Sequence, residues 1–238
     1  MNSNIIGIIQ ARMGSNRFPG KSLKHINGIP LLERIIKLQK DTLLLDDYIV
    51  ATSDLKIDDD IEVLCKSLKV KCYRGSEKNV LERFMDIINL YNPKIIVRLT
   101  GDNIFVDADL INYCLQAYLN EIKKIKYGYI GVDTGFPFGL SLEIFDKLEF
   151  LKLKDVDNKY EKEHVTWGFK NKLNKANILK IKSPIKVNAS NIRLSLDTEE
   201  DLNYILMFLK KLDKNLINPN YINVLQLCKQ VENEKNKF

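Results

Sequence analysis

The feature that most constrains the fold of this chain is an apolar run that changes abruptly into a basic loop. Residues 5–9 read Ile-Ile-Gly-Ile-Ile, and this β-branched run predicts a buried strand. Residues 10–22 hold two arginines, two glycines, a proline and a lysine, which predicts a loop. A polar loop directly after a buried strand is typical of a ligand site at the carboxyl edge of a parallel sheet.

The composition of this loop favours a phosphate-bearing ligand, most simply a nucleotide. Glycines allow backbone N–H groups to approach a polyanion, and Arg12, Arg17 and Lys21 supply positive charge. Ser15 offers a hydroxyl donor or a magnesium contact. The alternative is a solvated connection between a strand and a helix, which has a similar composition.

The loop ends in Gly-Lys-Ser but does not match a Walker A motif. Five residues separate Gly14 from Gly20, where that motif has four. Pro19 also lacks the N–H group that a phosphate cradle needs at its position. The chain has no Gly-x-Gly-x-x-Gly motif for a dinucleotide either, so the loop predicts a phosphate site of another kind.

Composition narrows the class of protein. The chain has 238 residues and no linker-like stretch, so we expect one α/β domain. The net charge of +6 comes from dispersed lysines without a block of like charges, which argues against nucleic acid as a partner. The four cysteines form no Cys-x-x-Cys pair, which favours reduced core thiols. The absence of a leader-like N-terminus or a long apolar run favours a cytoplasmic protein without a membrane partner.

The first half of the chain alternates between predicted strands and helices. Strands are expected at residues 48–52, 70–74 and 95–100. Helices are expected at residues 30–40 and 80–91, and a further helix is expected to begin near residue 58. Polar residues follow each strand. This order predicts an open, mostly parallel sheet whose site lies along the carboxyl ends of its strands.

The rhythm changes after residue 106. Helices are expected at residues 108–124, 161–172 and 221–231, and another helix is expected to begin at residue 198. The C-terminal end of the chain is expected to be a disordered tail. Strand-like runs lie at residues 127–130, 140–145, 176–182 and 192–197. We interpret residues 127–145 as a substrate and dimerisation insertion in a domain of residues 1–212, followed by a C-terminal helix and tail at 213–238.

Two aspartates follow predicted strands. Asp102 comes after a strand and a glycine, and Asp197 ends a late strand just before a helix. Two carboxylates that face a basic phosphate loop are consistent with a divalent metal that bridges the phosphates of a nucleotide. The structural alternative is that each aspartate caps the helix that follows it.

A series of motifs strengthens this interpretation. They are Gln10-Ala-Arg-Met-Gly-Ser-Asn-Arg-Phe-Pro-Gly-Lys, Val50-Ala-Thr-Ser, Gly75-Ser-Glu, Val80-Leu-Glu-Arg, Val97-Arg-Leu-Thr-Gly-Asp, Glu163-His-Val-Thr and Arg193-Leu-Ser-Leu-Asp-Thr-Glu-Glu-Asp-Leu. In this order they resemble the cytidylyltransferase family that includes the spore-coat polysaccharide protein SpsF. That family is a branch of the set containing the CMP-sialate and CMP-Kdo synthetases.

The resemblance implies a fold and an activity. The fold is a three-layer, nucleotide-diphosphosugar-transferase-like (Rossmann-like) α/β fold with a mostly parallel central sheet, often in a homodimer. The activity uses CTP and Mg²⁺ to make a CMP-activated sugar or sugar acid for surface glycans, with release of pyrophosphate.

The resemblance also implies the residues of the site. Arg12, Lys21 and Asp102 are expected to be catalytic, and Asp102 and Asp197 to bind metal. Glu143, Glu163 and His164 are expected to bind the acceptor substrate, with a structural role as the alternative for His164. The nucleotide-binding set is Gln10, Ala11, Arg12, Gly14, Ser15, Arg17, Lys21, Thr52, Ser53, Thr100 and Gly101.

Two departures from the family pattern leave other functions open. The run after Gly101-Asp is Asn-Ile-Phe instead of a Cys-Pro-Leu-like sequence, and Asn79 stands where an acidic residue is usual. The alternatives are a catalytically inactive nucleotide-sugar-binding scaffold, a glycosyltransferase of the same fold, or a uridylyl- or guanylyltransferase. The Gln10-Ala-Arg run argues against the last of these.

Overall fold

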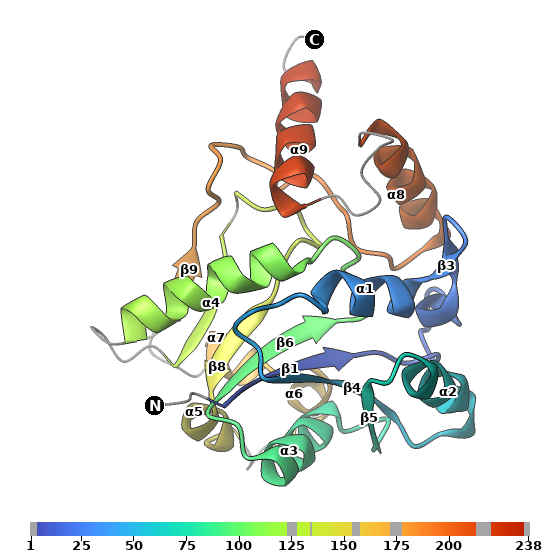
Figure 1. Ribbon diagram of the computed structural model, residues 1–238, viewed down its shortest axis with the longest axis vertical. Coiled ribbons are helices and arrows are strands. Elements are labelled where there is room, and N and C mark those ends of the chain that lie inside the picture. Colours follow the sequence, from blue (N-terminus) through green and yellow to red (C-terminus); the bar gives the residue numbers. More distant parts are fainter. Residues whose placement is uncertain are drawn as a thin grey trace.

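The computed structural model describes residues 4–122, 128–133, 135–153, 158–171, 178–212 and 220–235. In these residues seven strands form a central sheet, shown in Figure 1. The strands of this sheet are β1 (Ile5–Gln10), β4 (Asp47–Ser53), β5 (Lys71–Gly75), β6 (Ile95–Thr100), β7 (Tyr129–Val132), β8 (Glu143–Asp146) and β9 (Ile178–Ile181). A small hairpin of β2 (His25–Ile26) and β3 (Ile29–Pro30) follows the first loop.

The sheet is mostly parallel, as predicted. Its order is β5-β4-β1-β6-β8-β7-β9, and in the described part of the sheet β8 alone runs antiparallel to its neighbours. Strand β1 lies between two parallel neighbours and is buried on both faces, which explains its unbroken apolar sequence. The carboxyl ends of β1, β4, β5 and β6 therefore meet at one edge.

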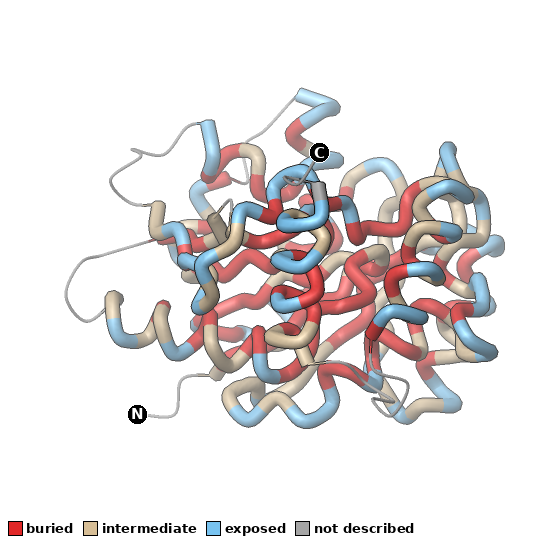
Figure 2. The backbone as a smooth tube through the Cα atoms, turned by 90° about the horizontal axis from the view of Figure 1, so that it is seen from above, coloured by how far each residue is buried: buried red, intermediate tan, exposed pale blue. Residues whose placement is uncertain are grey.

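Helices cover both faces of the sheet, and the buried residues run through the middle of the molecule (Figure 2). The longer helices are α1 (Leu31–Gln39), α2 (Asp59–Ser67), α3 (Val80–Tyr91), α4 (Ala108–Ile122), α8 (Glu199–Lys211) and α9 (Tyr221–Lys235), and the short ones are α5 (Lys147–Leu151), α6 (Lys159–Glu163) and α7 (Trp167–Asn171). One hydrophobic core joins the sheet to α1, α2, α4, α8 and α9, and a second joins it to α3, α5 and α7. No helix in the described ranges has the length and apolarity needed to cross a bilayer.

The alternation predicted for the first half of the chain is confirmed, but the predicted helix at residues 161–172 is wrong. The chain forms α6, breaks at His164 (φ −100°, ψ 76°), and resumes as α7. At the break Val165 and Thr166 turn inward and are buried, and the Thr166 hydroxyl donates to the Glu143 carboxylate. Tertiary packing of this β-branched pair overrides the helical pattern. Residue 172 lies outside the described residues.

The predicted strand at residues 192–197 is also wrong. This segment crosses the carboxyl edge of the sheet and makes two isolated bridges, Asn103 to Ser195 and Phe138 to Arg193. Its backbone pairs with two different loops, because Leu194 N donates to Phe138 O and Leu196 N donates to Asp102 O. A strand needs one continuous neighbour, which this segment does not have.

Other boundaries differ in detail. The last helix continues to Lys235, four residues beyond the predicted end, because the tail's Glu-Asn-Glu-Lys sequence continues the helix. Some predictions fall on residues outside the described ranges. They are the predicted strand and helix ends at residues 123–124, 127 and 176–177, the domain boundary at 212/213 and the tail at 236–238. The two strand-like runs of the 127–145 segment are β7 and β8, and both lie in the central sheet.

Candidate active site

The ends of β1 and β6 touch at the carboxyl edge of the sheet. Gly101 N donates to Gln10 O at 2.8 Å. A Cβ atom on Gly101 would lie 2.9 Å from the Ala11 Cβ, so only glycine allows this approach. The contact places Asp102 beside the basic loop.

The basic loop is held from within and from below. Gly20, at φ +75°, donates its N–H to Met13 O at 2.9 Å, and the Ser22 hydroxyl donates to Arg12 O at 2.9 Å. Below the loop, the buried Asp58 carboxylate accepts from Met13 N at 2.7 Å and from the hydroxyl and N–H of Ser53. Contacts within the protein therefore define the shape of the loop.

Lys21 connects the two predicted metal ligands. Its Nζ donates to Asp102 Oδ2 at 3.1 Å, to Asp197 Oδ1 at 2.8 Å and to the Leu196 carbonyl at 2.9 Å. These contacts bring together three segments separated by more than seventy residues in sequence. In this cluster the main contacts of both aspartates are ion pairs, and neither acts mainly as a helix cap.

Asp197 is surrounded by cations. In addition to Lys21 it contacts Arg17 Nη2 at 3.1 Å and pairs with Arg193. Burial raises the pKa of the Asp197 carboxyl, but Lys21, Arg17 and Arg193 outweigh burial and hold the pKa below its usual value. Asp197 is therefore a charged carboxylate at neutral pH.

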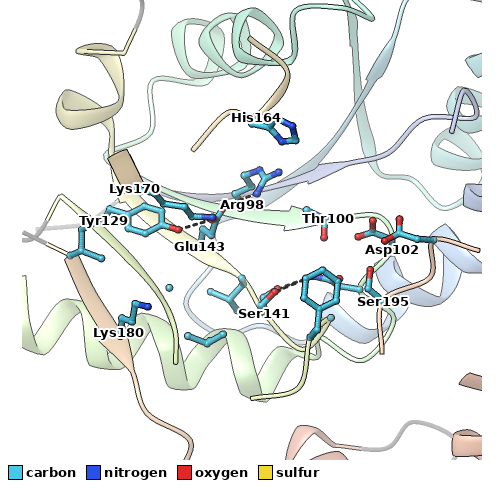
Figure 3. Close-up of a pocket in the computed structure, with 18 of the residues that line it drawn as sticks. Arg98, Thr100, Asp102, Tyr129, Ser141, Glu143, His164, Lys170, Lys180 and Ser195 are labelled. Carbon is cyan, nitrogen blue, oxygen red and sulfur yellow. Dashed lines mark hydrogen bonds and ion pairs between the residues drawn. The ribbon is translucent and has the colours of Figure 1, made fainter. Parts of the chain in front are cut away.

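Two adjoining cavities open at this edge of the sheet. The smaller, of about 340 Å³, contains the basic loop and the ends of β1 and β6. The larger, of about 1030 Å³, lies toward β7, β8 and β9 (Figure 3). Six residues line both cavities: Arg17, Arg98, Thr100, Asp102, His164 and Asp197.

Most of the predicted site residues line these cavities. The smaller cavity is lined by Gln10, Ala11, Arg12, Ser15, Arg17, Lys21, Thr100, Gly101, Asp102, Glu163, His164 and Asp197. Three predicted nucleotide-binding residues line neither cavity: Gly14, Thr52 and Ser53. Thr52 and Ser53 are buried beneath the loop, and Ser53 supports it through Asp58.

Glu143 lies in the larger cavity with its carboxylate already engaged. Tyr129 Oη donates to it at 2.6 Å, Lys170 Nζ lies at 2.7 Å, and Thr166 and Arg98 also bond to it. Burial opposes its charge, but Arg98 and Lys170 reverse this effect and lower the pKa of Glu143 to about 2. The geometry makes Glu143 an anchor for other side chains of the cavity.

The remaining predicted acceptor residues lie at the mouth of the smaller cavity. Glu163 Oε1 contacts Arg12 Nη2 at 3.4 Å. The His164 ring packs against Tyr160 with 4.1 Å between ring centroids, and His164 also borders the larger cavity.

The two departures from the family pattern have structural roles. Asn79 caps α3, and its side chain accepts from Glu82 N at 3.1 Å. Asn103 donates from its amide to Ser141 O at 3.1 Å, which ties the loop after β6 to the wall of the larger cavity. Neither change removes a group from the cluster of Lys21 and the two aspartates.

Several lining residues were not predicted from the sequence. They are Arg98, Asn103, Tyr129, Phe138, Ser141, Lys170, Lys180 and Ser195. Arg98 could have been found, because an arginine in the otherwise apolar strand 95–99 is unusual. Tyr129, Phe138 and Ser141 lie in the segment 127–145 that was predicted to recognise the substrate, and Asn103 and Ser195 are neighbours of the predicted aspartates. Lys170 and Lys180 come from segments that only tertiary structure brings to the site.

Comparison with known proteins gives consistent results. A family model described as cytidylyltransferase matches residues 6–230. The spore coat polysaccharide biosynthesis protein SpsF of Bacillus subtilis is 33% identical over 219 residues, covering 88% of each chain.

Solved structures share the fold. A cytidylyltransferase from Leptospira borgpetersenii superposes with a TM-score of 0.83 at 26% identity, covering 97% of this chain and 95% of that one. A CMP:2-keto-3-deoxy-manno-octonic acid synthetase complexed with CTP has a TM-score of 0.63 at 14% identity, covering 88% of this chain and 99% of that one. At this identity the second likeness concerns the fold alone.

Proposed function

The chain belongs to the cytidylyltransferase family and is a nucleotidyltransferase, and from this premise we propose that it transfers CMP from CTP to a sugar or sugar acid. The observation that carries the proposal is the pair of adjoining cavities with Lys21, Asp102 and Asp197 at their shared boundary. The smaller cavity, beside the basic loop, takes CTP. The larger cavity takes the acceptor.

The proposed reaction is an in-line displacement at the α-phosphorus of CTP. A bond forms between an acceptor hydroxyl oxygen and the α-phosphorus, while the bond from that phosphorus to the α,β-bridging oxygen breaks. The electron pair leaves with pyrophosphate, and the hydroxyl proton passes to solvent. Arg12, Arg17 and Lys21 bind the triphosphate and stabilise the leaving pyrophosphate, so catalysis rests on positioning and charge.

Asp102 and Asp197 are suitable ligands for Mg²⁺. Both contact the Lys21 ammonium group, so the two carboxylates lie close together at the boundary that the cavities share. No group of three or more acidic, histidine or cysteine ligands occurs among the described residues. The two carboxylates suit Mg²⁺, which commonly uses one or two carboxylates and completes its shell with substrate phosphates and water. When bound, Mg²⁺ would neutralise charge on the phosphates.

The setting of the reaction is also part of the proposal, and the name of one relative supports its pathway. The SpsF relative is named for spore coat polysaccharide biosynthesis, and we place this chain in surface-glycan biosynthesis, in the cytoplasm, as a homodimer. Residues 1–212 would form the catalytic domain, with acceptor recognition and dimer contacts near residues 127–145.

The test is pyrophosphate release from CTP and Mg²⁺ with a panel of sugars and sugar acids. We expect release with a subset of acceptors and a mass increase of that acceptor by one CMP unit. Consumption of a nucleotide sugar without use of CTP would support a glycosyltransferase. Binding of a nucleotide sugar without turnover of any donor would support an inactive scaffold.

A further inference from the structure

Arg98 lies on the wall that the two cavities share. It projects from β6 and lines both cavities, next to Thr100 and below His164 in Figure 3. In the proposed reaction the α-phosphorus also has to lie at this wall, because the nucleotide enters from one cavity and the attacking oxygen from the other. Arg98 therefore lies at the boundary where the new bond would form.

The guanidinium of Arg98 is held from two sides. Its Nη1 pairs with Glu143 Oε2, and its Nη2 donates to Gln10 Oε1 at 3.2 Å. A guanidinium has two N–H groups on each terminal nitrogen. Among the contacts of the described residues each terminal nitrogen uses one, so two N–H groups stay available to a ligand oxygen.

The partner of Arg98 is itself immobilised. The Glu143 carboxylate also binds Tyr129, Thr166 and Lys170, which come from β7, the break between α6 and α7, and α7. The cluster contains two cations, Arg98 and Lys170, and one carboxylate, Glu143, so its net charge is positive. A positively charged, fixed fork is the arrangement that binds a phosphoryl group well.

We propose that Arg98 is a catalytic residue that binds the α-phosphoryl group of CTP, and that Glu143 is the positioning residue that holds Arg98 in place. The inference rests on the proposed function, and it places one more cation beside the reacting phosphorus. Arg12, Arg17 and Lys21 belong to the loop and serve the triphosphate, whereas Arg98 comes from the sheet and lines the wall that the two cavities share. The competing interpretation is a purely structural ion pair between Arg98 and Glu143.

Binding of cytidine and of CMP, measured by calorimetry with Mg²⁺ present, separates these interpretations without a known acceptor. The two probes differ only in the α-phosphate. We expect Arg98→Met to lower the ratio of CMP affinity to cytidine affinity by about tenfold or more, with cytidine affinity unchanged. Arg98→Lys, which keeps one charge without the fork, is expected to recover part of the ratio. Lys40→Met is the control and should leave the ratio unchanged, since Lys40 is exposed and lines neither cavity.

These variants are expected to fold, because Glu143 keeps Tyr129, Thr166 and Lys170 as partners when Arg98 is replaced. The positioning role is tested by Glu143→Gln. It should lower the CMP-to-cytidine ratio when Arg98 is present and have no further effect in the Arg98→Met background.

Each alternative result has a defined meaning. Failure of the wild-type chain to bind cytidine, CMP and CTP would overturn the proposed function itself. Wild-type binding with no preference for CMP over cytidine, an unchanged ratio in Arg98→Met and Arg98→Lys, or an equal loss of both probes would overturn the role of Arg98 and leave a structural ion pair.

Discussion

The charged side chains of the site hold one another in position through ion pairs. Lys21 lies between Asp102 and Asp197, where its charge offsets two carboxylates at the edge of the sheet. Glu143 does the same for Arg98 and Lys170. Such preorganised charges favour binding of a polyanion, because little rearrangement is needed when it arrives.

The charge of Lys21 is expected to contribute directly to CTP affinity. Lys21→Met keeps the length of the side chain but removes the cation, so the dissociation constant for CTP should rise by about tenfold or more. Calorimetry with Mg²⁺ and CTP measures this change. Lys24→Met is the control, since Lys24 is an exposed lysine three residues away whose ammonium lies over the Phe18 ring. Equal effects of the two substitutions would argue against a specific role for Lys21.

Glu143 makes the stability of the protein depend on pH. Its pKa is lowered from 4.5 to about 2, so its contribution is fully present above about pH 4.5 and is lost as the pH falls toward 2. The gap in free energy of unfolding between wild type and Glu143→Gln should be on the order of 3 kcal/mol near pH 7 and shrink below about pH 4.5. Urea unfolding at several pH values measures this gap. A gap that does not change with pH would contradict the charge-based explanation.

At the scale of elements, the site depends on segments that cross the sheet edge without regular pairing. Residues 192–197 bond to the loop after β6 and to the loop after β7, and the break at His164 brings Thr166 onto Glu143. The sequence pattern predicted a strand and a continuous helix there, because periodicity reports only local preference. Distant partners such as Phe138 and Asp102 decide the conformation of residues 192–197.

The approach of one such segment requires a glycine. Gly139 has φ +97°, and a Cβ there would lie 2.3 Å from Ser195 N, a backbone atom that cannot move aside cheaply. Gly139→Ala should therefore destabilise the protein by well over 1 kcal/mol and distort the wall of the larger cavity. Gly28→Ala is the matched control, since Gly28 has φ +82° with nothing within 4 Å of the added Cβ. Its cost should be limited to the backbone strain, roughly 1 kcal/mol. Similar unfolding midpoints for the two variants would contradict the steric explanation.

At the scale of the whole molecule, the parallel half of the sheet was predictable from the sequence. The apolar runs of β1 and β6, each followed by polar residues, identified both the strands and the edge that carries the site. The placement of β7, β8 and β9 beyond β6 was not predictable, because strand order depends on contacts distant in sequence. For the same reason the basic loop and Asp102 could be identified as site residues, whereas Lys170 and Lys180 could not.

The central claim is that the edge formed by β1 and β6 binds CTP with Mg²⁺ for nucleotidyl transfer. The most direct test is a thermal-shift titration of the protein with each of the four nucleoside triphosphates, with and without Mg²⁺, because a bound ligand raises the melting temperature by mass action. We predict a shift with CTP that depends on Mg²⁺ and is lost in Asp102→Asn, which keeps the shape of the side chain but removes its charge. A lack of response to all four triphosphates, or an equal response of Asp102→Asn, would contradict this account.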